Sequence, residues 1–304
     1  MAVATATRPA KRFRRSSLYT WGTILPVLAL VSLFTLFPFV YAAVNSTRQR
    51  ILTIPYHQPF VGLENYREVI SSETFGVAVR NTLVFALLTV PTVTALGLGV
   101  ALLLNQRVRG FGVLVALVLL PWSIPLVSAG IMWRLLLHGN FGSLNGLLMQ
   151  LGIIDSYVPW LSDPDKAMGA VAMAHVWREF PLPTILFLAG LQTITPEILE
   201  AAWLDRATAW QRFRYVTLPL LKAPLLIVLV YETMIAVSVF DLVYVLTGGG
   251  PGTSTTLFSW YAYTATFKFL NLGQGAALSF LMTAALLIVI VIYMRLIRLR
   301  EESA

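Results

Sequence analysis

Long uncharged stretches separated by short charged segments dominate the chain. A bilayer core about 30 Å thick requires roughly 20 apolar residues in a helix that rises 1.5 Å per residue. Six stretches meet this requirement and predict six membrane-spanning helices. They lie between Arg15 and Arg48, Arg80 and Arg107, Arg109 and Arg134, Ala167 and Thr193, Ala223 and Thr247, and Lys268 and Arg295.

The spans are expected to be helices, because lipid cannot satisfy the backbone groups of an open sheet. Strands of a membrane barrel would alternate apolar and polar residues, and runs such as 284–291 do not. Pro181 and Pro183 are expected to kink the fourth helix. The outer loops, at about 45–80, 137–166 and 248–274, are expected to carry short helices.

Composition supports a membrane protein. Hydrophobic residues make up 57% of the 304 residues and charged residues only 12%, about half of the roughly 25% typical of soluble proteins. The mean hydropathy is +0.75. The absence of Cys excludes disulfide scaffolds and thiolate-ligated metals, and three scattered His cannot form a His-rich metal centre. We therefore expect no metal site, and no nucleic-acid binding, since no basic face with interleaved aromatics is present.

The distribution of basic residues predicts the orientation. The side that holds both termini carries 14 of the 22 Lys and Arg residues, and the opposite side carries 6. Because positive residues accumulate on the cytoplasmic side, both termini are expected in the cytoplasm. The predicted organisation is a basic N-terminus (1–20), a six-helix domain (20–296) and a cytoplasmic tail (297–304). The first apolar stretch is longer than a signal-peptide core, which favours an uncleaved helix.

The cytosolic loop at 194–219 contains the most specific pattern. Thr195 suits a helix N-cap and Pro196 the first helical position. A short amphipathic helix is expected to follow, and then a second one that carries Trp210 and Phe213, which Pro219 ends. Such an apolar hairpin suits docking into a partner's groove; the alternative is a helix that lies on the lipid surface.

This loop resembles the EAA loop of permease subunits in binding-protein-dependent ABC importers. The matching positions are Glu200-Ala201-Ala202, Asp205, Ala207, Phe213 and Leu218-Pro219. The end of the fifth span, Phe240-Asp241-Leu242-Val243-Tyr244-Val245-Leu246-Thr247-Gly248-Gly249-Gly250-Pro251, resembles the carbohydrate branch of the same family. The match is nearest to the first permease subunit of maltose and glycerol-3-phosphate importers.

The resemblance implies an all-α, type I ABC importer permease in a bacterial cytoplasmic membrane. It would move a di- or oligosaccharide, or a related polyol phosphate, by alternating access. The implied partners are a second permease subunit, two ABC ATPase subunits and an extracytoplasmic binding protein. The chain itself would have no catalytic residue and no cofactor, because ATP and Mg bind the ATPase subunits. The glycine-rich turn at 248–252 lacks the Lys of a phosphate loop, in agreement with this interpretation.

The resemblance implies that the hairpin couples the permease to the ATPase. Its coupling residues would be Glu200, Ala201, Ala202, Asp205, Arg206, Trp210, Phe213 and Pro219. The acidic pair would orient the hairpin, while the alanines and aromatics would fill the ATPase groove. The family has Gly where this chain has Arg206. Gly allows a positive φ in this turn, where arginine would cost about 1 kcal/mol. Either the turn is built differently here, or Arg206 adds a charge contact to the partner.

Charged residues inside the predicted spans suggest a substrate site, because burying charge in a bilayer is costly. The charged residues are Arg178, Glu179 and Glu232, and the resemblance to maltose-type permeases adds His175, Trp177 and Val239 to the implied substrate contacts. Arg178 and Glu179 lie roughly 17 Å into the fourth span, and Glu232 lies roughly 14 Å into the fifth, so their depths match. Helical geometry places His175, Arg178, Glu179 and Leu182 on one face and Trp177 off it. Trp177, Tyr231 and Tyr244 are candidate aromatic contacts for a sugar.

Three alternatives remain open on the sequence alone. The buried charges could pair with each other for structural reasons. The protein could be an ion-coupled secondary transporter that uses its intramembrane carboxylates as a relay, although no internal repeat is visible. It could also be a membrane-embedded, lipid-linked glycosyltransferase, which would need paired acids or a metal at a membrane face.

Overall fold

The protein is all helical across the residues that the computed structural model describes, which are 12–298 except 55 and 107–109. The helices in chain order are α1 (Arg12–Val31), η1 (Ser32–Leu36), α2 (Phe37–Ser46), α3 (Glu64–Ile70), α4 (Glu73–Leu104), α5 (Phe111–Ser123), α6 (Leu126–Leu136), α7 (Ser143–Gln150), α8 (Pro164–Glu179), α9 (Pro181–Gln192), α10 (Pro196–Leu204), α11 (Ala209–Arg212), η2 (Phe213–Thr217), α12 (Leu218–Leu220), α13 (Lys222–Ser238), α14 (Asp241–Leu246), α15 (Phe258–Tyr263), η3 (Thr264–Lys268) and α16 (Leu272–Arg298). The η segments are π-helical turns. The predicted termini, at 1–11 and 299–304, lie outside the described residues.

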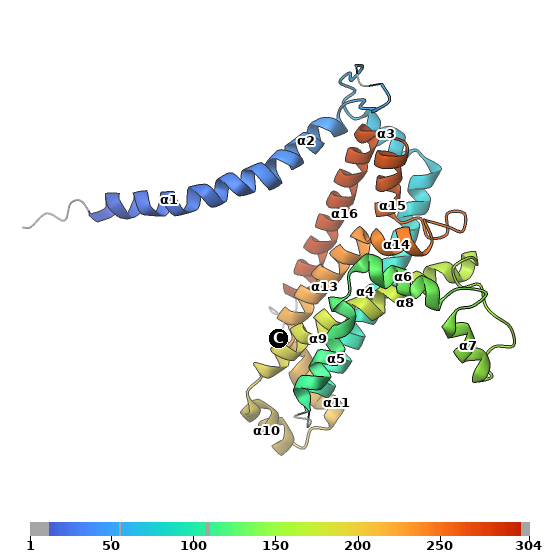
Figure 1. The fold of residues 1–304 in the computed structure, drawn as a ribbon. Coiled ribbons are helices and arrows are strands. Elements are labelled where there is room, and N and C mark those ends of the chain that lie inside the picture. Colours follow the sequence, from blue (N-terminus) through green and yellow to red (C-terminus); the bar gives the residue numbers. More distant parts are fainter. Residues whose placement is uncertain (1–11, 55, 107–109, 299–304) are drawn as a thin grey trace, which may run out of the picture.

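The six predicted spans form an all-α membrane bundle (Figure 1). Four spans are long apolar segments, at Trp21–Ser46, Glu73–Leu104, Lys222–Leu246 and Leu272–Leu296, and the third of these is divided into α13 and α14 at Val239 and Phe240. The other two are each built from two helices, α5 with α6 and α8 with α9. The hairpin of α10 and α11 lies at the opposite end of the bundle from α3 (Figure 1), which agrees with the alternation of sides that six spans predict.

The third span is broken, and its prediction as one helix is wrong. The axes of α5 and α6 differ by 91°. Ile124 between them is extended, with φ −78° and ψ 128°, because a residue before proline is sterically disfavoured in the α region and Pro125 follows. The third span therefore bends sharply at the outer end of α5, which is its cytosolic half.

The fourth span contains the predicted break at its prolines. Helix α8 ends at Glu179 and α9 begins at Pro181. Proline suits this first helical position, because a backbone N–H there would have no partner within α9. Leu182 consequently belongs to α9, so the predicted face that joins it to His175 is divided between two helices.

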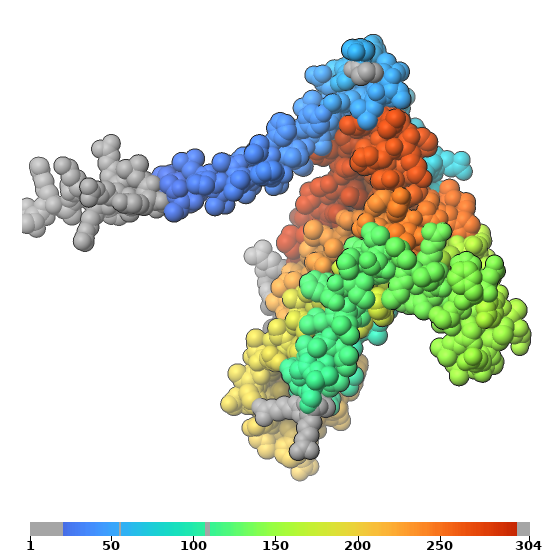
Figure 2. Space-filling model, viewed as in Figure 1, coloured from blue at the N-terminus to red at the C-terminus, as the bar shows by residue number. Residues whose placement is uncertain are grey.

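The first span stands apart from the rest of the bundle (Figures 1 and 2). None of its most apolar stretch is buried. Only its outer end, in α2, packs against α16, where the rings of Phe39 and Phe280 lie 5.1 Å apart. Its apolar side chains can therefore be covered only by lipid or by another polypeptide.

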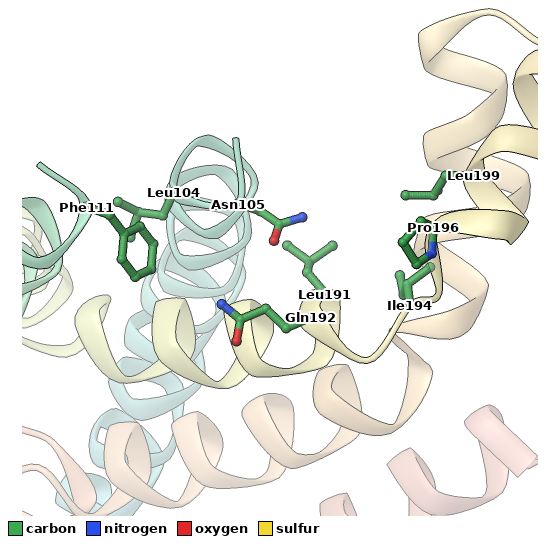
Figure 3. Close-up of a pocket in the computed structure, with 8 residues that line it drawn as sticks. All are labelled: Leu104, Asn105, Phe111, Leu191, Gln192, Ile194, Pro196 and Leu199. Atoms are coloured by element: carbon green, nitrogen blue, oxygen red, sulfur yellow. The ribbon is translucent and has the colours of Figure 1, made fainter. Parts of the chain in front are cut away.

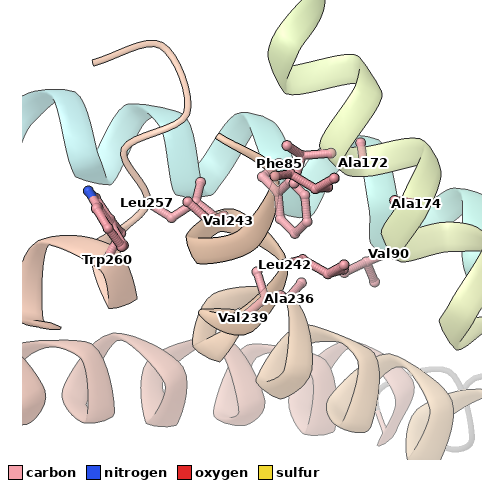
Figure 4. Packing of buried hydrophobic residues seen from close by; sticks show 12 residues of the cluster. Phe85, Val90, Ala172, Ala174, Ala236, Val239, Leu242, Val243, Leu257 and Trp260 are labelled. Atoms are coloured by element: carbon pink, nitrogen blue, oxygen red, sulfur yellow. The ribbon is translucent and has the colours of Figure 1, made fainter. Parts of the chain in front are cut away.

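Helix α4 is at the centre of the remaining bundle and packs against α8, α9 and α13. Buried apolar side chains from α4, α8, α13, α14 and α15 form one core of the bundle, which includes Phe85, Ala172, Val239 and Trp260 (Figure 4). Helix α9 approaches α4 closely at Gly97, where the absence of a Cβ leaves room for Pro183. A Cβ on Gly97 would lie only 2.6 Å from the Cβ of Pro183. A side chain at this position would force α4 and α9 apart.

The outer loops carry the expected short helices, α3, α7 and α15. The first of them is tied to the end of the first span, where the Asn65 amide donates to the carbonyls of Ser46 and Arg48, at 2.8 Å each. These bonds hold the outer end of the first span against the bundle.

Candidate functional site

The cytosolic hairpin begins as its sequence predicts. Thr195 has the extended N-cap conformation, with φ −67° and ψ 140°, and Pro196 and Glu197 occupy the first turn of α10. A 74° bend between α9 and α10 turns the chain away from the bundle. Helix α10 has no fully buried residue, and most of its side chains are exposed, with Leu199 and Ala202 half-buried.

Arg206 adopts the strained turn in which the family has glycine. Its φ is +56°. The Arg206 N–H donates to the Trp203 carbonyl at 3.0 Å, and the Ala207 N–H donates to the Ala202 carbonyl at 3.1 Å. These two bonds form a Schellman motif with arginine at its left-handed position. Arginine therefore occupies the left-handed position of this turn itself.

A capping box starts the second helix only two residues later. The Thr208 N–H donates to the Gln211 side chain at 2.8 Å, and the Gln211 N–H donates to the Thr208 hydroxyl at 3.3 Å. The sequence Thr208-Ala209-Trp210-Gln211 carries the signature of this motif, and the sequence reasoning missed it. The Schellman motif and the capping box together fix the angle of the hairpin.

The second helix does not end at Pro219, so that part of the prediction is wrong. Helix α11 continues into the π-helical turn η2 and then into α12, in which Pro219 occupies the first turn. The interruption comes at Leu221, whose φ is −86° and ψ is 7°.

The hairpin presents large apolar side chains to its surroundings. Trp203 and Trp210 are each 66% exposed, and the Trp210 ring lies 5.6 Å from that of Phe213. The remaining predicted coupling residues are exposed or half-buried on the same hairpin: Glu200, Ala201, Ala202, Asp205, Arg206 and Phe213. An apolar cytosolic surface of this kind marks a protein or membrane contact.

Two grooves separate the hairpin from the bundle. One of about 650 Å³ lies between the ends of α4 and α9 and the start of α10, lined by Asn105, Leu191 and Pro196 among others (Figure 3). The second, of about 710 Å³, lies beside α11 and is lined by Trp210 and Phe213. Open grooves therefore lie between the hairpin and the ends of α4 and α9.

Replacing Arg206 by Gly is expected to stabilise the hairpin turn by about 1 kcal/mol, because glycine adopts positive φ without a Cβ clash. Hydrogen exchange at the amides of residues 206–208 would measure it as slower exchange. Arg206→Val is the matched variant and should exchange faster than wild type, since a β-branched residue fits this conformation worst. Equal exchange in all three proteins would contradict the strain argument.

Four charged or titratable side chains meet inside the bundle at the predicted substrate site. His175, Arg178 and Glu179 project from α8 and Glu232 from α13; all except Arg178 are fully buried. Arg178 Nη1 donates to Glu179 Oε1 at 2.5 Å. Arg178 also interacts electrostatically with His175 and Glu232. We call these four residues the charged cluster.

The polar atoms of the charged cluster are only partly satisfied. Among the residues that the structure describes, neither oxygen of Glu232, neither ring nitrogen of His175, nor Glu179 Oε2 has a hydrogen-bond partner. Two carboxylates thus face one guanidinium. Buried polar groups normally have hydrogen-bond partners. The unpaired carboxylate oxygens of Glu179 and Glu232 are therefore suited to accept hydrogen bonds from the hydroxyl groups of a ligand.

The two remaining predicted substrate residues lie outside the charged cluster. Trp177 packs edge-on against Trp133, with ring centroids 5.7 Å apart, whereas His175 packs against Phe85 at 5.1 Å. This separation agrees with the predicted placement of Trp177 off the His175 face. Val239 occupies the break between α13 and α14, with φ −59° and ψ 120°.

Tyr231, one of the candidate aromatics, lies beside the charged cluster. It interacts electrostatically with both Glu179 and Glu232. The cluster therefore has an aromatic neighbour with a polar tip, a combination suited to a ligand that carries both apolar faces and hydroxyl groups.

Comparison with known families decides the class of protein. Residues 82–302 match the model of the family described as binding-protein-dependent transport system inner membrane component. The chain belongs to this family. It is accordingly a multi-pass permease subunit of an ABC transporter, with a transport role and no enzymatic one.

Curated relatives match over almost the whole chain. The trehalose/maltose transport system permease protein MalF of Thermococcus litoralis is 40% identical over 92% of this chain and 93% of its own length. The sulfoquinovosyl glycerol transport system permease protein SmoG of Agrobacterium fabrum is 35% identical, over 91% and 90% respectively. The trehalose transport system permease protein SugA of Mycobacterium tuberculosis is 32% identical, over 90% and 86%.

A solved structure shares the fold. A chain of a bacterial ABC transporter involved in the import of alginate matches with a TM-score of 0.80, over 93% of this chain and 96% of that one, at 21% identity. This confirms the predicted type I importer permease fold.

Proposed function

We propose that this permease subunit imports a carbohydrate, a di- or oligosaccharide or a related polyol phosphate, driven by ATP hydrolysis on separate subunits. The observation that carries the proposal is the rigid, apolar hairpin at the cytosolic end of a family permease. The named substrates of the relatives, trehalose, maltose and sulfoquinovosyl glycerol, support a carbohydrate.

In this proposal the hairpin transmits movement between the ATPase and the bundle. Ala201, Ala202, Trp210 and Phe213 would enter a groove on the ATPase, because their surface is apolar and exposed or half-exposed. Glu200, Asp205 and Arg206 would orient the hairpin by charge. The open grooves beside the hairpin support this role, since they leave room for a shift that would reach the bundle through α9.

The substrate would bind between α8 and α13. Sugar hydroxyls would donate to the unpaired oxygens of Glu179 and Glu232, while the guanidinium of Arg178 would donate to ring or hydroxyl oxygens. Closing and opening the two sides of the bundle in turn would carry the sugar past this point by alternating access.

The proposed assembly contains a second permease subunit, two ABC ATPase subunits that bind ATP and Mg, and an extracytoplasmic binding protein, in a bacterial cytoplasmic membrane. The uncovered apolar surface of the first span supports a second permease subunit. The alginate importer was crystallised with a periplasmic protein bound to an alginate pentasaccharide, which supports delivery by such a protein.

The test is uptake of radiolabelled maltose and trehalose by vesicles that hold the complete importer. Uptake is expected to need ATP and the binding protein, and to continue when ionophores collapse proton and sodium gradients. Uptake that ends with the gradients and survives without ATP would instead establish the ion-coupled alternative.

A further inference from the structure

A line of aromatic rings leads outward from the break in the fifth span. The rings are those of Phe240, Tyr244, Trp260, Tyr263 and Phe267, here called the aromatic ladder. Their centroids lie 4.5 Å apart for Phe240 and Tyr263, 6.0 Å for Tyr244 and Trp260, and 5.2 Å for Tyr263 and Phe267. The ladder thus joins α14, α15 and η3, which are separated in sequence by the glycine-rich outer turn.

The inner end of the aromatic ladder lies at the break between α13 and α14. Phe240 directly follows Val239, and both residues leave the helical conformation, with ψ 120° at Val239 and φ −123° at Phe240. The Val239 carbonyl accepts a hydrogen bond from the Ser259 hydroxyl at 2.5 Å, which ties the break to α15. The first ring of the ladder is therefore held one residue from a predicted substrate contact.

The ladder offers its rings to the surroundings at two points. Tyr244 is 51% exposed and Phe267 is 65% exposed, whereas Trp260 between them is buried (Figure 4). The ammonium of Lys268 lies 4.6 Å from the Trp260 ring centroid. Lys268 and the turn at Gly249, where a Cβ would lie 2.2 Å from Trp260 Nε1, hold this ring in place.

The two ladder tyrosines also keep polar groups available. Within residues 12–298, apart from 55 and 107–109, neither the Tyr244 nor the Tyr263 hydroxyl makes a hydrogen bond to the protein. Tyrosine presents an apolar ring with a polar tip and normally finds a partner for it when buried. A pyranose ring has a complementary surface, with C–H groups on its faces and hydroxyl groups around its edge.

We propose that the aromatic ladder is a carbohydrate-stacking surface at the outer mouth of the permease, on which a sugar ring rests before it reaches the charged cluster. This inference rests on the proposed function. The structural alternative is a belt of aromatic residues at the lipid headgroups. The two differ because a stacking surface needs the aromatic rings for transport, whereas a headgroup belt does not.

The test compares ring-removing with ring-keeping variants in the vesicles described above. Tyr244→Leu and Tyr263→Leu are each expected to lower uptake of maltose or trehalose about tenfold, the loss of roughly one stacking contact. Tyr244→Phe and Tyr263→Phe keep the ring and should retain most of the uptake. ATP hydrolysis stimulated by the binding protein should stay within about twofold of wild type in all four variants.

Phe60→Leu is the matched control, because this outer ring is 74% exposed and lies outside the ladder; its uptake should equal that of wild type. Leu variants that transport within about twofold of wild type would overturn the proposal in favour of a headgroup belt. Leu variants that no longer co-purify with the other subunits would overturn it in favour of a packing surface. If the wild-type importer takes up neither sugar, the proposed carbohydrate function is contradicted, and the ladder proposal is contradicted with it. This result is distinct from the headgroup-belt and packing-surface outcomes, in which wild type still transports.

Discussion

Ala201→Asp is expected to abolish ATP-driven uptake while the protein still inserts and folds. Ala201 is exposed on α10, and exposed substitutions usually change the free energy of unfolding by less than about 0.5 kcal/mol. In a docked hairpin the new carboxylate would be buried without a partner, at about 3–5 kcal/mol. Coupled uptake and stimulated ATPase activity should therefore fall by at least about a hundredfold.

Ala201→Ser is the matched control, because it keeps a small side chain without a charge and should retain both activities. Immunoblots compare the amounts of wild-type and variant permease in the membrane. Co-purification measures the amount of ATPase subunit bound to each. Unchanged uptake by Ala201→Asp would show that α10 does not enter an ATPase groove. The hairpin would then lie on the lipid surface, the alternative that its apolar side chains also permit.

Arg178→Met is expected to produce the largest loss of stability in the chain. The guanidinium is 2.5 Å from Glu179 and within electrostatic range of Glu232, and both carboxylates are fully buried. Removing one partner of a buried ion pair leaves an uncompensated charge and typically costs about 3–5 kcal/mol. Thermal unfolding of the detergent-solubilised protein should show a large fall in the midpoint temperature.

The double variant Arg178→Met/Glu179→Gln should recover part of this loss, since it removes both charges of the pair. Arg134→Met serves as a control, because Arg134 is exposed and its contact with the Val245 carbonyl, at 3.3 Å, is long. A fall of less than about 1 kcal/mol in Arg178→Met would mean that Arg178 does not neutralise the cluster.

The approximate positions of the spans could be predicted from the sequence because hydropathy and charge act locally along each helix, although α4 begins at Glu73, before the predicted limit at Arg80. The breaks were harder to predict. Pro121 lies inside α5 without ending it, whereas Pro125 separates α5 from α6. Both prolines stand in the same apolar stretch, so the difference comes from packing against neighbouring helices, which one sequence does not display.

The two candidate sites differ in how much of them could be predicted. The charged cluster follows from helical spacing, since three of its members stand within five residues of each other on one helix. The positive φ of Arg206 does not, because arginine alone prefers the right-handed helical region, and the two bonds of the Schellman motif are what hold it. The aromatic ladder joins residues on either side of a turn of the chain. Their proximity follows from the fold and not from their spacing in the sequence.

The breaks in the third, fourth and fifth spans lie at the outer ends of the cytosolic half-helices α5, α9 and α13, which have 13, 12 and 17 residues. At 1.5 Å per residue they lie roughly 18–25 Å from the inner ends of these helices. Helices α4 and α16 cross the same level without interruption. In the alternating access proposed above, changes in a few backbone torsions at these breaks would tilt three half-helices against two continuous helices.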